Sequence, residues 1–390
     1  MNNFKGPVII LLLFVLISLP VLAEQPDFEL TASSSLLMEV DTGEILFSKN
    51  EHHKLPPASM TKIMTMILVM EAVEDGRANL GDKILVSERA ASMGGSQVYL
   101  EPGEEITLEN AMKAIAISSA NDACVAVAEY IYGTEKDFIK KMNEKADKLN
   151  LKDTYYYNTN GLPPSDPEVT GNYTSAYDLA ILTNEIYRFP KVFEWTSTWI
   201  DYIRDGEFVL NNTNRLVRHY KGVNGLKTGY TQEAGFCVTC TAEKNDLKFI
   251  SVIMNAESSK KRFLEATKLL SYGYNSFTSM EIAKNGEIIK KILIKNARNQ
   301  QAQVIVPEKL AVPVKKGEEE KISKEIIIEK NLKAPMEKGD KAGKIIIYKG
   351  NLKIKEAELI IDRDVEKASI FQIIMRILKN LYIILIKIFI

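Results

Sequence analysis

Three short motifs follow one another along the chain: Ser59-Met60-Thr61-Lys62, Ser119-Ala120-Asn121 and Lys227-Thr228-Gly229. Each motif alone occurs by chance in many proteins. All three together, in this order and each in a fitting local context, indicate a serine enzyme that forms an acyl intermediate and uses a lysine as its base. The fold of this chain must therefore bring the three segments together.

Histidine is scarce, which limits how a nucleophile could be activated. The three histidines are His52, His53 and His219, and no G-x-S-x-G motif is present. His52 and His53 are adjacent in a polar connector, where a solvated position is expected. A Ser-His-Asp triad and a zinc site built from several histidines are both poorly supported. Another group must activate the nucleophile.

The first motif lies at the start of a helix predicted from about Ser59 through Met70. Positions i and i+3 share a helix face, so the Lys62 amine can reach the Ser59 hydroxyl. A lysine with the ordinary pKa of about 10.4 is protonated at neutral pH, but burial, the positive helix end and a second nearby lysine favour the neutral amine. Neutral Lys62 can take the Ser59 proton during attack on a carbonyl, and the Ser59 N–H can face the oxyanion. The alternative is that Ser59 only caps the helix.

The second motif interrupts an alanine-rich helical region predicted over residues 108–132. Small residues there allow a loop to enter a cleft. Ser119 can relay a proton between Lys62 and a leaving amine, and the Asn121 amide can hold Lys62 and the peptide group of a substrate. The alternative is a pair of N-cap residues for a helix that begins near Asp122, a role compatible with catalysis.

The third motif lies where the chain enters a predicted strand. Lys227 offers a fixed positive charge and Thr228 a hydroxyl donor, which together suit a carboxylate. Gly229 lets an extended substrate lie against the strand edge, and the backbone N–H of Tyr230 can be the second oxyanion donor. Arg262 is a candidate second partner for the carboxylate. The alternatives are an ordinary turn for the motif and a solvated helix charge for Arg262.

Residues 24–275 are predicted to form one α+β domain, with strands at both ends of a helix-rich middle. Hairpins are expected over residues 34–48 and 235–254. From residue 276 to 364, short β-rich runs alternate with turns, which predicts a small all-β domain without histidine or cysteine. Helices are expected over residues 59–70, 108–132, 173–189 and 261–274.

The two ends of the chain predict export and membrane attachment. Residues 1–23 contain Lys5, a short apolar run and Ala23, the features of a signal peptide cleaved after Ala23. A permanent N-terminal anchor is the alternative. Residues 365–390 are predicted to form an amphipathic helix, because the polar side chains of residues 369–390 fall within a sector of roughly 100° on a helical wheel. This pattern favours an anchor lying in the membrane plane, with a transmembrane helix or a helix packed on the protein's own core as alternatives.

Charge and cysteine content exclude other classes of function. The formal net charge of −1 gives no reason to expect a nucleic-acid partner. Cys237 and Cys240 form a C-x-x-C pattern inside a predicted strand, where i and i+3 point to opposite faces, so buried side chains are expected rather than a redox pair. No metal ligand set is indicated, and no cofactor is expected.

The chain resembles the low-molecular-mass penicillin-binding proteins, which are serine D-alanyl-D-alanine carboxypeptidases of the bacterial cell wall. The resemblance covers essentially the whole chain and rests on Pro57-Ala58-Ser59-Met60-Thr61-Lys62, on Gly225-Leu226-Lys227-Thr228-Gly229-Tyr230-Thr231, and on residues 95–103, 121–123, 214–216 and 334–346. It implies a penicillin-binding/serine β-lactamase-like transpeptidase domain. It also implies removal of the terminal D-alanine from peptidoglycan stem pentapeptides, acylation by β-lactam antibiotics, and a place on the outer face of the cytoplasmic membrane.

Three alternative interpretations remain open at this point. A serine β-lactamase shares all three motifs, although the additional glutamate that class A enzymes use for deacylation is not identifiable. A transpeptidase or endopeptidase could use the same scaffold and would differ in the acceptor of the acyl group. A catalytically silent wall-binding protein is a third possibility, and the presence of Ser59, Lys62, Ser119 and Lys227 argues against it.

Overall fold

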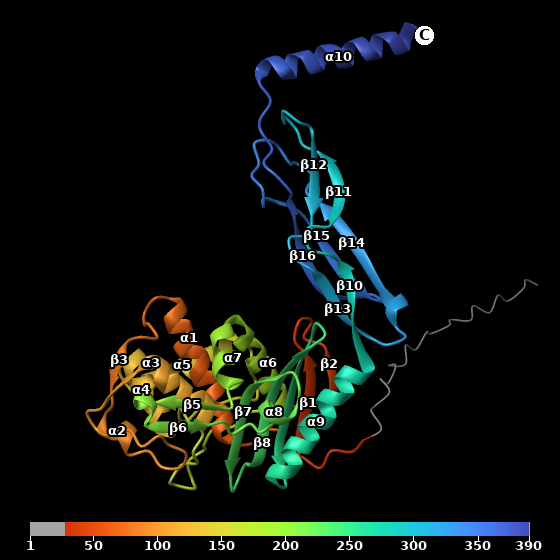
Figure 1. Cartoon of the computed structure of the whole chain (residues 1–390). Helices are drawn as coiled ribbons and strands as arrows, with labels where there is room; N and C mark the ends of the chain where they lie inside the picture. The colour runs from red at the N-terminus through yellow and green to blue at the C-terminus, as the bar shows by residue number, and fades with distance from the viewer. Residues whose placement is uncertain (1–27, 390) are drawn as a thin grey trace, which may run out of the picture.

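The computed structural model describes residues 28–389, so the predicted signal peptide of residues 1–23 lies outside the described residues. Figure 1 shows three parts in chain order: a mixed domain of helices and strands, an elongated β domain, and a C-terminal helix that lies across the far end of the β domain. The predicted α+β domain followed by an all-β domain is confirmed.

A five-stranded antiparallel sheet forms the centre of the first domain, with strand order β2-β1-β9-β8-β7. Its strands are β1 (Ser34–Glu39), β2 (Ile45–Lys49), β7 (Val223–Thr231), β8 (Gly235–Lys244) and β9 (Leu247–Ala256). The two predicted hairpins are present, and they join where β1 pairs with β9, for example Leu36 opposite Val252. Strand β7 is left at one edge of the sheet.

Both faces of this sheet are covered (Figure 1). Helix α9 (Ser259–Ser276) packs on one face, and α6 (Ala176–Glu185) with the other helices covers the opposite face. Each face of the sheet therefore has its own apolar core, and successive side chains of a strand point alternately into one core and the other. Cys237 belongs to the core on the α6 side and Cys240 to the core under α9, and both are free, buried thiols as predicted.

The helical half surrounds α1 (Lys62–Glu74), which is buried along most of its length. The predicted helix over 108–132 is broken into α3 (Leu108–Lys113), a π-helical turn at Ala114–Ser118 and α4 (Asn121–Tyr132). Further elements are β3 (Lys83–Leu85), α2 (Glu88–Ala91), β4 (Glu105–Thr107), α5 (Glu135–Lys148), α7 (Pro190–Thr196), β5 (Ile200–Ile203), β6 (Phe208–Asn211) and α8 (Leu216–His219).

The β domain contains a two-stranded and a five-stranded antiparallel sheet around one apolar core. The first pairs β10 (Phe277–Ala283) with β13 (Leu310–Lys315). The second has the order β11-β12-β16-β15-β14. Its strands are β11 (Ile288–Leu293), β12 (Gln301–Ile305), β14 (Ile322–Ile328), β15 (Lys341–Lys349) and β16 (Leu352–Ile361).

Ion pairs join the β domain to turns of the first domain. The Lys349 amine lies 2.7 Å from the Glu44 carboxylate, in the turn after β1. Lys309 lies 2.7 Å from Asp246, in the turn between β8 and β9. In both pairs the lysine belongs to the β domain and the acid to the first domain.

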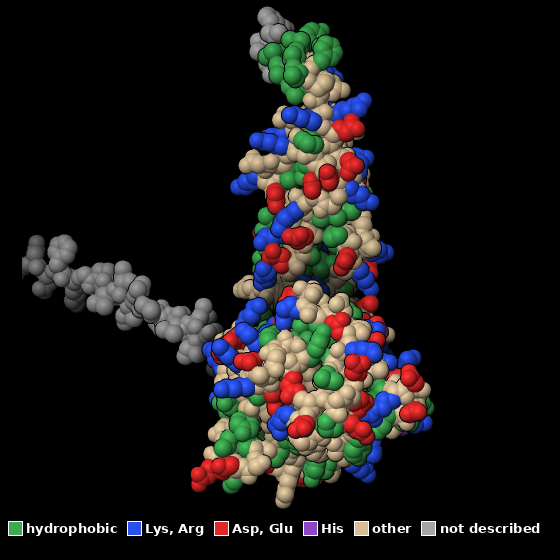
Figure 2. Space-filling view, turned by 90° about the vertical axis from the view of Figure 1, so that its left-hand side faces the viewer, with side chains coloured by type: hydrophobic (Ala, Val, Ile, Leu, Met, Phe, Trp, Pro, Cys, Tyr) green, Lys and Arg blue, Asp and Glu red, His purple; other side chains and the backbone are tan. Residues whose placement is uncertain are grey.

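The C-terminal helix α10 (Ile370–Phe389) matches the amphipathic helix predicted over this segment. Arg376, on its polar side, donates to the Ala297 carbonyl at 2.7 Å and so faces the β domain. Ile370 and Phe371 are 78% and 71% exposed. Figure 2 shows hydrophobic side chains gathered on this helix, whereas the domains below carry mixed charges. Within residues 28–389, no helix qualifies as a membrane span.

Candidate active site

Ser59 lies in a 3₁₀ turn, η1 (Ala58–Thr61), that leads directly into α1. The regular helix thus begins at Lys62, three residues later than predicted. The tighter turn brings i and i+3 into register. The Lys62 amine accordingly lies 2.8 Å from the Ser59 hydroxyl oxygen. Pro57 occupies the N-cap position of η1, so the alternative of Ser59 as a simple cap is wrong.

Lys62 is fully buried, and its amine has three hydrogen-bond acceptors. Besides Ser59, the amine reaches the Asn121 side-chain oxygen at 2.6 Å and the Asn160 carbonyl at 2.9 Å. Burial lowers the pKa of Lys62 to about 8, although the nearby Cys124 and Asp122 side chains favour the charged form. At neutral pH a useful fraction of the amine is therefore unprotonated, with a lone pair that can accept the Ser59 proton.

Ser119 directly follows the π-helical turn and has a left-handed backbone, with φ of +66°. This conformation ends the helix and lets the chain restart at α4. The Ser119 hydroxyl oxygen accepts from the Lys227 amine at 2.8 Å. The N-cap of α4 is Ala120, so Ser119 and Asn121 are not the capping pair that was the alternative.

Asn121 is held by the segment before it. Its side-chain nitrogen donates to the Gly94 carbonyl at 2.7 Å, and its backbone N–H donates to the Ser96 carbonyl at 2.7 Å. These bonds orient the side-chain oxygen toward Lys62, because the amide nitrogen is already engaged. The buried Asp122 carboxylate accepts from the Val98 N–H at 3.0 Å and stabilises the same segment.

The third motif lies inside edge strand β7, not in a turn. Lys227 is fully buried, and burial followed by the charge of Lys62 holds its pKa well below the ordinary value. The Thr228 hydroxyl donates to the Thr213 hydroxyl oxygen at 2.9 Å. A Cβ at Gly229 would lie only 2.6 Å from the Pro57 carbonyl oxygen. The glycine therefore lets η1 pack against β7, a different reason from the substrate contact predicted for it.

Arg262 of α9 is buried behind β7 and is not the solvated helix charge that was the alternative. Its guanidinium donates to the carbonyls of Gly229 at 3.0 Å and Cys237 at 3.3 Å. Burial lowers the pKa of Arg262 to about 10. The guanidinium also lies 5.5 Å from the centre of the Phe236 ring, on which the half-exposed Tyr230 stacks. Arg262 thus supports the strand that carries Gly229 and Tyr230.

Asn160 and Thr213 contact the site residues, although no motif identified them. Asn160 contributes only its backbone carbonyl, which any residue could supply. A sequence signal does exist in the run Asn158-Thr159-Asn160-Gly161, which is rich in turn-forming residues. Gly161 has a φ of +86°, and a Cβ there would overlap the Ala58 carbonyl oxygen, so this turn must approach η1 closely.

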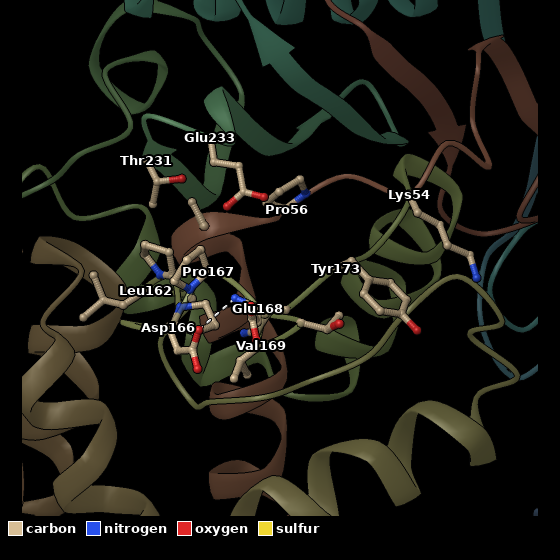
Figure 3. Close-up of a pocket in the computed structure, with 17 residues that line it drawn as sticks. Lys54, Pro56, Leu162, Asp166, Pro167, Glu168, Val169, Tyr173, Thr231 and Glu233 are labelled. Carbon is tan, nitrogen blue, oxygen red and sulfur yellow. Dashed lines mark hydrogen bonds between the residues drawn. The ribbon is translucent and has the colours of Figure 1, made fainter.

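A cavity of about 650 Å³ opens beside η1 (Figure 3). Ala58 contributes to its wall, as do the segment from Gly161 to Tyr173 and the residues Thr231 and Glu233 after β7. The cavity is therefore adjacent to Ser59. Among residues 28–389, no group of three or more His, Cys, Asp or Glu side chains could hold a metal ion.

Similar folds occur in solved structures of penicillin-binding proteins. A peptidoglycan synthesis regulatory factor (PBP3) from Streptococcus pneumoniae is 26% identical, with a TM-score of 0.77 over 87% of this chain and 100% of that chain. Penicillin-binding protein D2 from Listeria monocytogenes, in its ampicillin-bound form, is 31% identical, with a TM-score of 0.56 over 64% of this chain and 100% of that chain. The fold is thus that of the penicillin-binding proteins.

Sequence relatives identify the family within this class. The family model for D-alanyl-D-alanine carboxypeptidase matches residues 20–258, and that for the C-terminal domain of penicillin-binding protein 5 matches residues 277–367. D-alanyl-D-alanine carboxypeptidase DacF of Bacillus subtilis is 41% identical over 88% of each chain. The chain belongs to the D-alanyl-D-alanine carboxypeptidase family. The predicted family and enzyme class, a serine-type D-Ala-D-Ala carboxypeptidase, are confirmed.

Proposed function

We propose that Ser59 attacks the carbonyl between the two terminal D-alanines of a peptidoglycan stem pentapeptide, with Lys62 as the base. The observation that carries this proposal is the Lys62 amine, 2.8 Å from the Ser59 hydroxyl oxygen and with a pKa lowered to about 8. Lys62 takes the hydroxyl proton as the bond from the serine oxygen to the carbonyl carbon forms. Asn121 holds the amine in place through the hydrogen bond to its side-chain oxygen.

The developing oxyanion is bound by the backbone N–H groups of Ser59 and Tyr230. Support comes from the contact between η1 and β7, where the Ser59 nitrogen is 3.3 Å from the position of a Cβ on Gly229. Both donors belong to well-packed backbone, so they need no reorganisation during the reaction. Arg262 keeps its carbonyl contacts with the strand and acts as a positioning residue rather than as a direct carboxylate ligand.

The free carboxylate of the substrate is bound by Lys227 and Thr228 on the edge of β7. A bound carboxylate would restore the charged form of Lys227 that burial disfavours. Ser119, hydrogen-bonded to Lys227, donates its hydroxyl proton to the departing amine as the carbon–nitrogen bond breaks, and the proton held by Lys62 replaces it, so that Lys62 is neutral again. Water then attacks the ester and loses a proton to Lys62, which returns it to the Ser59 oxygen as the ester bond breaks. A β-lactam enters the same route and forms a stable ester with Ser59.

We further propose that the enzyme works on the outer face of the bacterial cytoplasmic membrane. Residues 1–23 would direct export, residues 24–275 would form the catalytic domain, and residues 276–364 would separate it from the anchor formed by residues 365–390. Support comes from the exposed apolar side chains of α10, including Ile370 and Phe371. Arg376 turns the polar side toward the β domain, an orientation suited to a helix lying in the membrane plane.

Labelled penicillin tests the nucleophile and D-alanine release tests the reaction. Purified protein should take up one label, which peptide mapping places on Ser59, and Ser59→Ala should take up none. A stem pentapeptide should release D-alanine faster than nitrocefin is turned over. Label retained by Ser59→Ala would overturn the assignment of the nucleophile, and fast nitrocefin turnover without D-alanine release would indicate a β-lactamase.

A further inference from the structure

A second cavity, of about 560 Å³, lies where α10 leaves the β domain. Two β-domain segments and the first turn of α10 form its wall, to which Gln372 belongs on the helix side. Figure 1 shows this junction at the end of the β domain that is farthest from the catalytic domain. The cavity is therefore separate from the active site and takes no part in the chemistry at Ser59.

The orientation of α10 puts this cavity at the depth of the lipid headgroups, given the membrane placement proposed above, on which this inference rests. The exposed side chains Ile370 and Phe371 enter the acyl region. Arg376 faces the β domain instead and donates to the carbonyls of Ala297 at 2.7 Å and Arg298 at 2.5 Å. The space between the helix and the tip of the β domain thus lies among the headgroups, and the cavity opens there.

The charged side chains that line the cavity are two cations and two anions. Arg298 and Arg363 supply guanidinium groups, and Asp364 and Glu366 supply carboxylates. All four side chains are exposed, so they can exchange water for a ligand without a change in the fold. Because the formal charges cancel, an anion or a cation alone would be attracted by one pair and repelled by the other. A ligand that carries one charge of each sign fits the cavity best.

The contacts within the protein leave these groups with unused hydrogen-bonding capacity. Arg363 donates to the Gln301 carbonyl at 3.3 Å, and Arg298 pairs with Glu366 at 2.9 Å. A guanidinium has five N–H donors, so most of them remain for a phosphate. One oxygen of Asp364 accepts from a backbone N–H at 2.8 Å, which holds the carboxylate in place. Its second oxygen can accept from an ammonium group.

We propose that this cavity binds the headgroup of a zwitterionic phospholipid whose cation is a primary ammonium, as in phosphatidylethanolamine. Arg298 and Arg363 bind the phosphodiester, because planar guanidinium groups match pairs of phosphate oxygens. The ammonium group donates to Asp364 and Glu366, whereas the trimethylammonium group of phosphatidylcholine has no N–H to donate. The β domain thus recognises a headgroup, and α10 supplies the apolar attachment.

Co-sedimentation with electrically neutral vesicles tests this inference. The full-length protein is titrated with phosphatidylcholine vesicles that contain or lack phosphatidylethanolamine, and the preference is the ratio of the two apparent Kd values. Ethanolamine lipids also loosen lipid packing and so favour α10 insertion, an effect common to all variants with an intact helix. The preference of Asp364→Asn/Glu366→Gln should therefore be about threefold to tenfold lower than that of the wild type, as expected for one or two partly exposed ion pairs.

Two further variants complete the test. Arg298→Gln/Arg363→Gln should bind both kinds of vesicle about threefold to tenfold more weakly, because both lipids carry the phosphodiester. Glu308→Gln/Glu320→Gln is the matched control for the acidic pair, since both residues are exposed carboxylates of the β domain away from this cavity, and it should keep the wild-type preference.

An acidic-pair variant with the wild-type preference, or an arginine variant with wild-type affinity, would overturn the headgroup proposal and leave the membrane placement standing. Failure of the wild-type protein to bind these vesicles and anionic ones alike would overturn both. Penicillin labelling of every variant should match the wild type, which shows that the catalytic domain is folded.

Discussion

The rate of Ser59 acylation should rise steeply between pH 6 and pH 8, because the reaction requires neutral Lys62. With a pKa of about 8 for Lys62, the neutral fraction is about 1% at pH 6 and about 50% at pH 8. The first-order acylation rate at saturating penicillin should therefore increase about fifty-fold over this range and level off above about pH 9. An ordinary lysine would instead give a rise centred more than two pH units higher.

Stopped-flow measurements with a fluorescent penicillin provide the assay. Saturating drug is needed because its bound carboxylate keeps Lys227 protonated, so the profile reports Lys62. Circular dichroism at each pH should confirm that the protein stays folded. Lys62→Arg cannot supply a neutral base, so its rate should fall by about 10²- to 10⁴-fold and lose the rise with pH.

Two results would refute this reasoning. A flat profile from pH 6 to pH 9 would show that deprotonation of Lys62 does not limit acylation. A pH-dependent rise of wild-type amplitude in Lys62→Arg would assign the titration to another group.

The other predictions concern packing, strand support and the anchor. Gly229→Ala should slow acylation at least about tenfold, because the new Cβ would lie 2.6 Å from the Pro57 carbonyl oxygen. Gly81→Ala, with open space at its Cβ, should acylate at the wild-type rate. Unchanged acylation in Gly229→Ala would contradict the packing argument. Arg262→Ala should lower the free energy of unfolding in urea by about 1–3 kcal/mol, because it leaves two strand carbonyls without their buried donor, and a loss near zero would show that water replaces it. Deletion of residues 370–390 should abolish co-sedimentation with anionic phospholipid vesicles and leave penicillin labelling intact, and continued sedimentation would place the membrane contact elsewhere.

Local spacing predicted the contacts made by Ser59 and Lys62. Ser59 and Lys62 are three positions apart, and a helical turn places such residues on one face, so the short amine–hydroxyl distance could be predicted from the sequence alone. The approach of Asn121 to Lys62 was also anticipated, since both motifs suited one centre. The 3₁₀ geometry of η1 was not, because it depends on close packing against Gly161 and Gly229, which lie far away in the chain.

Tertiary packing decided the remaining features. Ser119 was expected to relay a proton between Lys62 and a leaving amine, and the sequence did not indicate that its hydroxyl accepts from the Lys227 amine or that its backbone is left-handed. Arg262 follows Lys260 and Lys261 in the sequence, which is typical of a solvated helix face, but it is buried because α9 packs against the sheet there. Whether a helix residue faces solvent or the sheet depends on the position of the sheet, which the local sequence pattern does not show.

The pairing of β1 with β9 has a consequence for how the enzyme is made. These strands are separated by about 200 residues of chain, and β9 must be available before β1 can lie between two strands of the sheet. β7 reaches β9 only through β8, so Lys227 cannot be held opposite Ser119 until that hairpin has docked. Long-range pairing of this kind is slow and is completed late in folding. A nascent chain that stops short of residue 247 therefore lacks an assembled active site. Covalent binding of penicillin then reports that synthesis has passed residue 247 and that the five-stranded sheet has formed.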